Sequence, residues 1–438
     1  MGPGSRVDER APSAAERAYA AVAPLVFHAL HLGVRLRGAA PDALAQRTGA
    51  MPACAAPCLW LHGASAGEMA AAVSLVALLR AKRYRFSAAY TTTNAAGLEL
   101  IARRLAAGDV SALVPWDVPR WIARALDCWR PLALVLIETE LWPGLIRAAA
   151  ERGVPVLSAS ARIFPRDRWR YRLCRGLMRP VLRRLTAVLA QSDVERAQFV
   201  ALGAPTERCA VAGNLKHAGP AAVSPAAVSA FQAALGLAPE ERPCVIGSLH
   251  ADEIAFVAPA VVRAVAAGQR VIVAPRHAAG LRDTAAAAAR QGWRVARRTD
   301  AQVRADWHVL LLDTMGELHL AYAAARVAVV GGAFARHGGH DIAEPVRAGA
   351  PVLFGTHTAH VAGDAAALRA AEPAAEVATP SALAERLAEW TGDAALRQQV
   401  WRRQHAALPD AAAVAARYLA ALAPWLEGLQ AGDAGSHG

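Results

Sequence analysis

The stretch from Leu59 to Leu79 constrains the fold of this chain more than any other. It opens with LWLH, which is typical of the end of a buried strand, and continues with GASAGEM, where the small residues Gly63, Ser65 and Gly67 let the backbone bend sharply. The alanine-rich run that follows has leucine and valine at helical core spacing. A strand, a tight loop and a helix form the first half of a βαβ unit, in which ligands bind beyond the carboxyl ends of the strands.

Glu68 falls in the first turn of this predicted helix, where unpaired backbone N–H groups favour a carboxylate. An acid at the mouth of a crevice is a natural general base. Alternatively, Glu68 only completes the start of the helix, and the spacing leaves both interpretations open.

The same alternation of strand and helix continues along the chain, whose 438 residues are enough for two domains. The expected organisation is a disordered start with a membrane-anchor helix (1–40), a first α/β domain (41–217), a linker (218–228), a second α/β domain (229–427) and a disordered tail (428–438).

Two carboxylates, Glu138 and Glu140, follow the continuous apolar strand 132–137 of the first domain. Such a strand is typical of a parallel sheet that is buried on both faces, and carboxylates at its end are costly unless they are paired or used. They could ligate a metal, orient a substrate or neutralise nearby arginines. No third ligand is visible nearby, so no metal site is predicted here.

The net charge of +12 comes almost entirely from arginine. An arginine excess fits phosphate, anionic lipid or nucleic-acid partners, and it also fits a GC-rich genome. The segment 162–184 holds nine arginines and one acid, with aromatic residues between them. It suits an anionic surface or a phosphorylated lipid, or it is a solvated helix face. No nucleic-acid-binding motif accompanies the arginines, so no nucleic-acid partner is expected.

The stretch from Ala18 to Val34 is apolar but contains Pro24, His28 and His31. It is shorter than the roughly 20 uninterrupted apolar residues of a confident membrane span. It could be a marginal span or an interfacial helix with basic flanks. The six cysteines show no Cys-x-x-Cys pair or zinc spacing, which favours free thiols.

In the second domain each polar cluster follows a strand. Arg276 and His277 follow one strand, Met315 opens a helix after another, and the turn from Gly338 to Glu344 follows a third. Glycines allow close backbone approach to a ligand, and helix N-termini suit phosphate. Glu344 could accept hydrogen bonds from ribose hydroxyls. The clusters therefore predict one crevice for a phosphorylated ligand. His337 and His340, taken as a pair, are interpreted as core or turn histidines.

The order and spacing of these segments resemble the 3-deoxy-D-manno-octulosonic acid (Kdo) transferases of lipopolysaccharide synthesis. The resemblance runs from about residue 18 to about residue 425. It rests on segments 61–68, 138–143, 159–162, 213–216, 275–277, 313–318, 338–345 and 351–358.

This resemblance implies a GT-B glycosyltransferase fold: two Rossmann-like domains facing a cleft, with an N-terminal membrane-anchor helix. The N-terminal domain would take a phosphorylated glycolipid acceptor and the C-terminal domain the donor, CMP-Kdo. The protein would sit on the cytoplasmic leaflet of the bacterial inner membrane.

The family's catalytic positions match Glu68, as the base, with Glu138 and Lys216 as transition-state stabilisers. Its CMP-binding positions match Pro275, Arg276, Met315, Gly316, Glu317, Asp341, Ile342, Ala343 and Glu344. The implied reaction inverts the donor's anomeric centre and uses neither a metal nor a cofactor.

The implied function is transfer of Kdo to a lipid A precursor, lipid IVA. Two segments depart from the family pattern, both on the donor side. Asp341-Ile342-Ala343-Glu344 stands where the family usually has Asn-Pro-Leu-Glu, and Leu249-His250-Ala251-Asp252 replaces small hydroxyl and acidic residues. The alternative is a divergent paralogue that uses another nucleotide-activated sugar or another acceptor.

Overall fold

The computed structural model describes residues 13–218, 223–300 and 306–426. The chain divides into two compact units: residues 1–219 with 410–438, and residues 220–409. The expected disordered start and tail, and the middle of the expected linker, lie mostly outside the described residues.

The first unit is built around a seven-stranded sheet in the order β3-β2-β1-β4-β5-β6-β7, and every strand pair is parallel. Its strands are β1 (Cys58–His62), β2 (Ser87–Thr92), β3 (Val110–Leu113), β4 (Ala133–Ile137), β5 (Val156–Ala161), β6 (Ala187–Ala190) and β7 (Cys209–Val211). Its helices are α1 (Ala14–Leu36), α2 (Pro41–Arg47), α3 (Ala66–Ala81), α4 (Ala95–Ala102), α5 (Pro119–Trp129), α6 (Pro143–Glu151), α7 (Arg168–Leu173), α8 (Arg175–Arg184), α9 (Asp193–Leu202) and α18 (Ala411–Leu426).

Strands β1 and β4 are fully buried, as their continuous apolar sequences predict. One face of the sheet packs in a core that includes Trp60 and Trp129, and the other in a core that includes Leu59 and Met69. Because the strands are parallel, the loops after β1, β2, β4, β5 and β7 emerge at one edge of the sheet.

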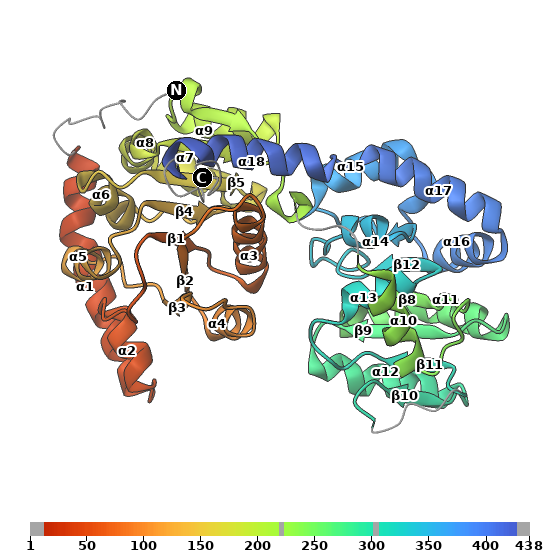
Figure 1. Cartoon of the computed structure of the whole chain (residues 1–438). Helices are drawn as coiled ribbons and strands as arrows, with labels where there is room; N and C mark the ends of the chain where they lie inside the picture. Colours follow the sequence, from red (N-terminus) through yellow and green to blue (C-terminus); the bar gives the residue numbers. More distant parts are fainter. Residues whose placement is uncertain (1–12, 219–222, 301–305, 427–438) are drawn as a thin grey trace, which may run out of the picture. The chain divides into compact units, whose positions relative to one another are not determined.

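Helix α18 belongs to the first unit, although it follows the last helix of the second in sequence (Figure 1). Its residues Val414, Tyr418 and Leu422 are buried in the core beside Met69 of α3. The expected second domain extended to residue 427 and included this helix. Its apolar stripe shows that one face is buried, but sequence periodicity does not tell which sheet receives that face.

Helix α1 packs against the first unit along one face. Tyr19 Oη donates a hydrogen bond to Asp117, and the ring of Phe27 stacks on those of Trp116 and Trp142, with centroids 5.6 and 6.1 Å apart. By length and composition, two described helical stretches could cross a membrane, at 14–36 and 394–426. The second contains α18, whose apolar face is buried in the first unit.

The second unit contains a six-stranded parallel sheet in the order β10-β11-β9-β8-β12-β13. Its strands are β8 (Cys244–Leu249), β9 (Val271–Pro275), β10 (Val295–Arg297), β11 (Val309–Leu311), β12 (Val327–Val330) and β13 (Val352–Phe354). Its helices are α10 (Pro225–Ala234), α11 (Ile254–Ala266), α12 (Ala278–Arg290), α13 (Leu318–Ala324), α14 (Ala343–Ala348), α15 (Ala362–Ala371), α16 (Pro380–Gly392) and α17 (Ala394–Ala407).

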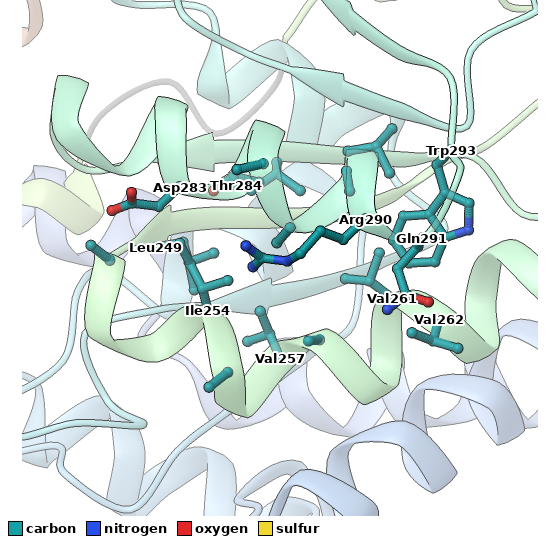
Figure 2. A pocket seen from close by; sticks show the side chains of 18 residues that line it. Leu249, Ile254, Val257, Val261, Val262, Asp283, Thr284, Arg290, Gln291 and Trp293 are labelled. Carbon is teal, nitrogen blue, oxygen red and sulfur yellow. The ribbon is translucent and has the colours of Figure 1, made fainter.

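A cavity of about 470 Å³ lies between α11 and α12 of the second unit. Figure 2 shows its mainly aliphatic lining, which includes Ile254, Val257 and Val261, with Trp293 at one end and the Arg290 side chain extending across the middle. Its lining includes Leu249 and Ala251 but none of the residues in the polar clusters predicted from the sequence. The volume of a cavity alone therefore does not identify the functional site of this unit.

Candidate active site

The turn between β1 and α3 holds Glu68 in a defined position. The Ser65 side chain caps α3 by accepting a hydrogen bond from the Glu68 backbone N–H at 3.2 Å. In return, the Glu68 carboxylate accepts hydrogen bonds from Ala64 N (2.5 Å) and from Ser65 Oγ (3.1 Å). Both interpretations of Glu68 from the sequence are compatible with this geometry, because the carboxylate closes the helix start and lies at the sheet edge.

The loop after β2 fixes the same turn from the other side. Thr92 Oγ1, Thr93 Oγ1 and Asn94 Nδ2 all donate hydrogen bonds to the carbonyl oxygen of Ala64, at 3.2, 2.9 and 2.7 Å. Three donors on one carbonyl leave the turn little freedom, and Glu68 is held in place with it.

Glu68 has a pKa raised to about 7. Burial is the largest cause, and the negative charges of Glu138 and Glu140 add to it. A carboxyl group that titrates near neutrality can take up a proton at physiological pH, which is what general-base catalysis requires.

Glu138 and Lys216 form an ion pair at the same edge, with 3.2 Å between Glu138 Oε1 and Lys216 Nζ. The Glu138 side chain is 6% exposed, and its backbone has a positive φ of 57°. A non-glycine residue in that conformation is strained, and such strain concentrates at functional sites. A Cβ placed on Gly67 would lie 3.6 Å from Lys216 Nζ, so the lysine reaches the start of α3.

Glu140 is held by His62 Nε2 at 3.1 Å and by Trp142 Nε1 at 2.8 Å. Burial alone would raise the pKa of Glu140, but the hydrogen bonds from these two groups outweigh it and lower the pKa. Glu140 is therefore an ionised neighbour that raises the pKa of Glu68. In the described residues Glu138 therefore pairs with a lysine, and Glu140 with a histidine and a tryptophan, rather than with the arginines considered from the sequence.

A hydrogen-bond network positions the segment that carries Lys216. Ser160 Oγ accepts from Leu215 N at 3.1 Å, and Asn214 Oδ1 accepts from Lys216 N at 3.1 Å. Tyr418 of α18 accepts a hydrogen bond from Ser160 N and donates one to Gly213 O, at 2.9 and 2.7 Å. The C-terminal helix therefore supports Lys216 indirectly.

In the second unit, Glu344 lies in the first turn of α14, and its pKa is raised to about 7 by burial and then by the charge of Asp341. Asp341 Oδ1 accepts hydrogen bonds from Ala343 N (3.0 Å) and Glu344 N (3.1 Å). Asp341 therefore caps the helix, and Ile342 and Ala343 are buried behind it.

Arg276 follows Pro275, the last residue of β9, and is exposed. Its charge lowers the pKa of His340 to about 4, after the larger effect of burial. Arg276 in the loop after β9 therefore interacts electrostatically with His340 in the glycine-rich loop after β12.

Met315 is 83% exposed, and Gly316 has a φ of +89°, which a glycine tolerates. Glu317 pairs with Arg298 at 2.9 Å. Within the described part of the chain, no hydrogen bond or ion pair links Glu317 to Arg276 or to Glu344. The predicted donor residues lie at one edge of the parallel sheet. Within that group, Glu317 pairs with Arg298 and not with the other predicted donor residues.

Sequence reasoning did not single out Glu253, which is 1% exposed. Its carboxylate accepts hydrogen bonds from the backbone N–H groups of four residues in two loops, namely His250, Gly332, Phe334 and Ala335, at 2.7 to 3.2 Å. The available signal was a carboxylate one residue before the apolar run that forms α11. His250 is three residues away, but the other three partners lie about 80 residues away, so periodicity could not reveal them.

Comparison with known proteins now bears on this geometry. Residues 42–218 match the family model described as 3-deoxy-D-manno-octulosonic-acid transferase (kdotransferase). A 3-deoxy-D-manno-octulosonic acid transferase of Bordetella pertussis is 31% identical over 392 residues, which cover 86% of this chain and 89% of that protein. The chain belongs to this family.

Solved structures agree on the fold. A Neisseria meningitidis UDP-GlcNAc 2-epimerase bound to UDP-GlcNAc aligns over 84% of this chain, at 10% identity, with a TM-score of 0.55. A Rickettsia africae glycosyltransferase also covers 84%, at 8% identity, with a TM-score of 0.53. The Kdo transferase family is a glycosyltransferase family, and the two parallel Rossmann-like sheets confirm the expected GT-B-like fold with an N-terminal apolar helix.

Proposed function

We propose that this chain transfers Kdo from CMP-Kdo to lipid IVA, a phosphorylated lipid A precursor, in lipopolysaccharide core biosynthesis. Membership of the Kdo transferase family supports the reaction class. The observation that carries the mechanism is Glu68, a positioned carboxylate with a pKa of about 7.

In the proposed step, Glu68 removes the proton from an acceptor hydroxyl as that oxygen attacks the anomeric carbon of the donor. The bond from this carbon to the phosphate oxygen breaks, and its electron pair leaves with CMP. Attack opposite the departing phosphate inverts the anomeric centre. Glu68 thereby supplies the general-base contribution, which is typically about 10²–10⁴-fold.

Glu138 and Lys216 stabilise the charges that develop during transfer. The anionic Glu138 favours positive charge on the sugar ring, and Lys216 favours negative charge on the departing phosphate. Preorganised charges of this kind are usually the largest contribution to catalysis. Their 3.2 Å ion pair and the network behind Lys216 support this assignment.

The second unit binds the donor in this proposal. Arg276 pairs with the nucleotide phosphate, and buried Glu344 accepts a hydrogen bond from a ribose hydroxyl. Pro275, Met315, Gly316 and Glu317 line the same sheet edge, and Asp341, Ile342 and Ala343 shape the turn. Because Asp341 is occupied by two backbone N–H groups, its role is capping, which leaves CMP-Kdo as the donor.

Helix α1 lies in the membrane interface in this proposal, on the cytoplasmic side of the inner membrane. One face is bound to the first unit, whereas Leu25, Leu32 and Leu36 are 72%, 54% and 78% exposed. Their spacing of seven and four residues puts them on one stripe of the helix. An apolar groove of about 610 Å³, lined by other residues of the N-terminal half of α1 such as Val22 and Val26, lies between α1 and the start of α8 and would accept acyl chains of the acceptor.

The combined variant Leu25→Glu, Leu32→Glu, Leu36→Glu tests the interfacial helix. Because these side chains are exposed, folding should persist, and binding to vesicles of anionic phospholipid should fall about tenfold or more. Flotation of the purified protein with vesicles measures it. Val194→Glu, at a position 61% exposed in the same unit, should bind like the native protein. Equal binding by the triple variant would remove α1 from the membrane contact.

The reaction is tested by incubating the purified full-length protein with CMP-Kdo and lipid IVA. Mass spectrometry should show lipid IVA with added Kdo, together with stoichiometric CMP. A folded protein that releases no CMP and adds no Kdo would refute the proposal and favour the divergent paralogue, whose donor or acceptor would then be sought among other activated sugars and lipids.

A further inference from the structure

Three side chains from two loops of the second unit converge outside the groups used above. His250 follows β8, Asp252 lies in the short turn after it, and His337 comes from the loop after β12. One potential ligand atom from each residue lies within 4.8 Å of the others. His337 Nε2 is 2.9 and 3.0 Å from the two carboxylate oxygens of Asp252.

The arrangement is held by buried contacts rather than by the three side chains themselves. Glu253 ties the backbone of His250 to that of Gly332 and Phe334, and so fixes the two loops against each other. His340 Nε2 lies 2.8 Å from His250 Nε2 and restrains that ring. The rings of His250 and His337 are stacked, with centroids 3.8 Å apart.

Folding does not require this cluster. The side chains of Asp252 and His337 are 59% and 35% exposed, and exposed ion pairs contribute about 0–1 kcal/mol at most. Three donor groups that meet at an accessible point on a rigid frame have the form of a ligand site.

We propose that His250, Asp252 and His337 bind a divalent transition metal ion of the Zn²⁺ type. Two imidazoles and one carboxylate are a common zinc ligand set, with bonds of about 2.0–2.2 Å and a fourth position left for water or an anion. Ligands on one such ion lie within about 4 Å of each other. The three ligand atoms lie within 4.8 Å of one another, and rotation of the exposed Asp252 side chain would bring them to the shorter spacing.

Sequence spacing does not predict this site, because the nearest histidine pair, His337 and His340, lies within one loop. The other two ligands come from a segment 85 residues earlier, where this chain departs from the family pattern at Asp252. The metal takes no part in the transfer step described above, and its binding does not depend on the proposed function.

Titration of the full-length protein with Zn²⁺ alone, followed by calorimetry, tests the proposal. We expect one saturable site with micromolar affinity or tighter. His337→Asn and Asp252→Asn should each weaken binding by about tenfold or more, the effect of losing one of three ligands. His405→Asn, at an exposed histidine of α17, should leave binding unchanged.

Cysteines are the competing zinc ligands, since Cys54 and Cys58 have sulfur atoms 3.4 Å apart. The absorption spectrum of the Co²⁺-loaded protein separates the two sources. A tetrahedral nitrogen and oxygen spectrum without a thiolate charge-transfer band, lost in His337→Asn, supports the site. A thiolate band, no saturable binding, or binding that is unchanged in both variants overturns it.

Discussion

The carboxyl edges of the two sheets use different chemistry on the same architecture. The edge of the first unit gathers Glu68, Glu138 and Glu140, and Glu138 pairs with Lys216. The edge of the second unit has glycines, imidazoles and arginine, and its most buried acid, Glu253, is fully engaged with backbone N–H groups. In the first unit, repulsion between neighbouring carboxylates raises the pKa of Glu68. In the second unit, the hydrogen bonds of Glu253 hold two loops together.

Glu68 and Glu344 make this difference concrete. Both have a pKa raised to about 7, and burial is the largest cause for both. Glu68 adds the repulsion of two further glutamates, while Glu344 adds that of Asp341, which is itself bound to the start of α14. In our proposal, the same pKa thus serves proton transfer in one unit and ligand binding in the other.

Removing the lysine from the acidic edge is expected to have a large effect. Lys216→Met should lower kcat for Kdo transfer by about 10²–10³-fold, because a preorganised charge at the transition state is lost. CMP affinity should change less than about twofold. Steady-state kinetics and CMP calorimetry measure both.

Lys82→Met, at the exposed end of α3, is the matched control and should keep native kcat. Lys216→Met leaves Glu138 buried without its cation, so a thermal unfolding curve must show that the Lys216→Met protein is folded. Native kcat in folded Lys216→Met would put transition-state stabilisation elsewhere.

The pH dependence of kcat sharpens the comparison. Glu68 must be ionised to act as a base, so kcat should rise with pH through about 7 and level off above it. Below that pH, kcat should fall about tenfold per unit, because the ionised fraction falls tenfold. A profile of kcat from pH 5 to 9 measures this limb.

The same titration affects stability. Because the folded-state pKa of Glu68 lies above its ordinary value of 4.5, its contribution to stability is present below pH 4.5 and is lost as pH rises through about 7. The unfolding temperature of the native protein should therefore fall relative to Glu68→Gln between pH 5 and pH 8. A flat kcat profile with no such relative fall would contradict the raised pKa.

The smallest expected effect is that of Asp341→Asn. Asparagine still accepts the two hydrogen bonds that cap α14, so kcat/KM with CMP-Kdo should stay within about threefold of native. Kinetics with CMP-Kdo measure it. A large gain or loss would show that the charge of Asp341 helps to select the donor.

Local patterns predicted the strands and the turn around Glu68 because strand burial and helix capping depend on neighbouring residues. They also predicted which loops carry polar clusters, since parallel topology puts those loops at one edge. The pairing of His62 with Glu140 and the four bonds of Glu253 were not predicted. The His62–Glu140 contact and three of the four Glu253 bonds join residues about 80 positions apart, which leave no periodic signal.

The packing of α18 in the first unit could not be predicted either, because it also depends on contacts between residues far apart in the sequence. Its buried Tyr418 bonds to Ser160 and Gly213, more than 200 residues earlier in the chain. The family resemblance supplied the fold and the roles of matched residues, but not the contacts that tune them.

The central claim is that the acidic edge performs the chemistry and the glycine-rich edge binds the donor. It is tested most directly by measuring kcat and CMP affinity together in Glu68→Gln and Glu344→Gln, with the exposed Glu99→Gln and Glu385→Gln as controls. Glu68→Gln should lose about 10²-fold or more in kcat and keep CMP affinity. Glu344→Gln should weaken CMP binding about tenfold or more, which is the loss of one charge-assisted hydrogen bond. Native kcat in Glu68→Gln, or native CMP affinity in Glu344→Gln, would contradict the account.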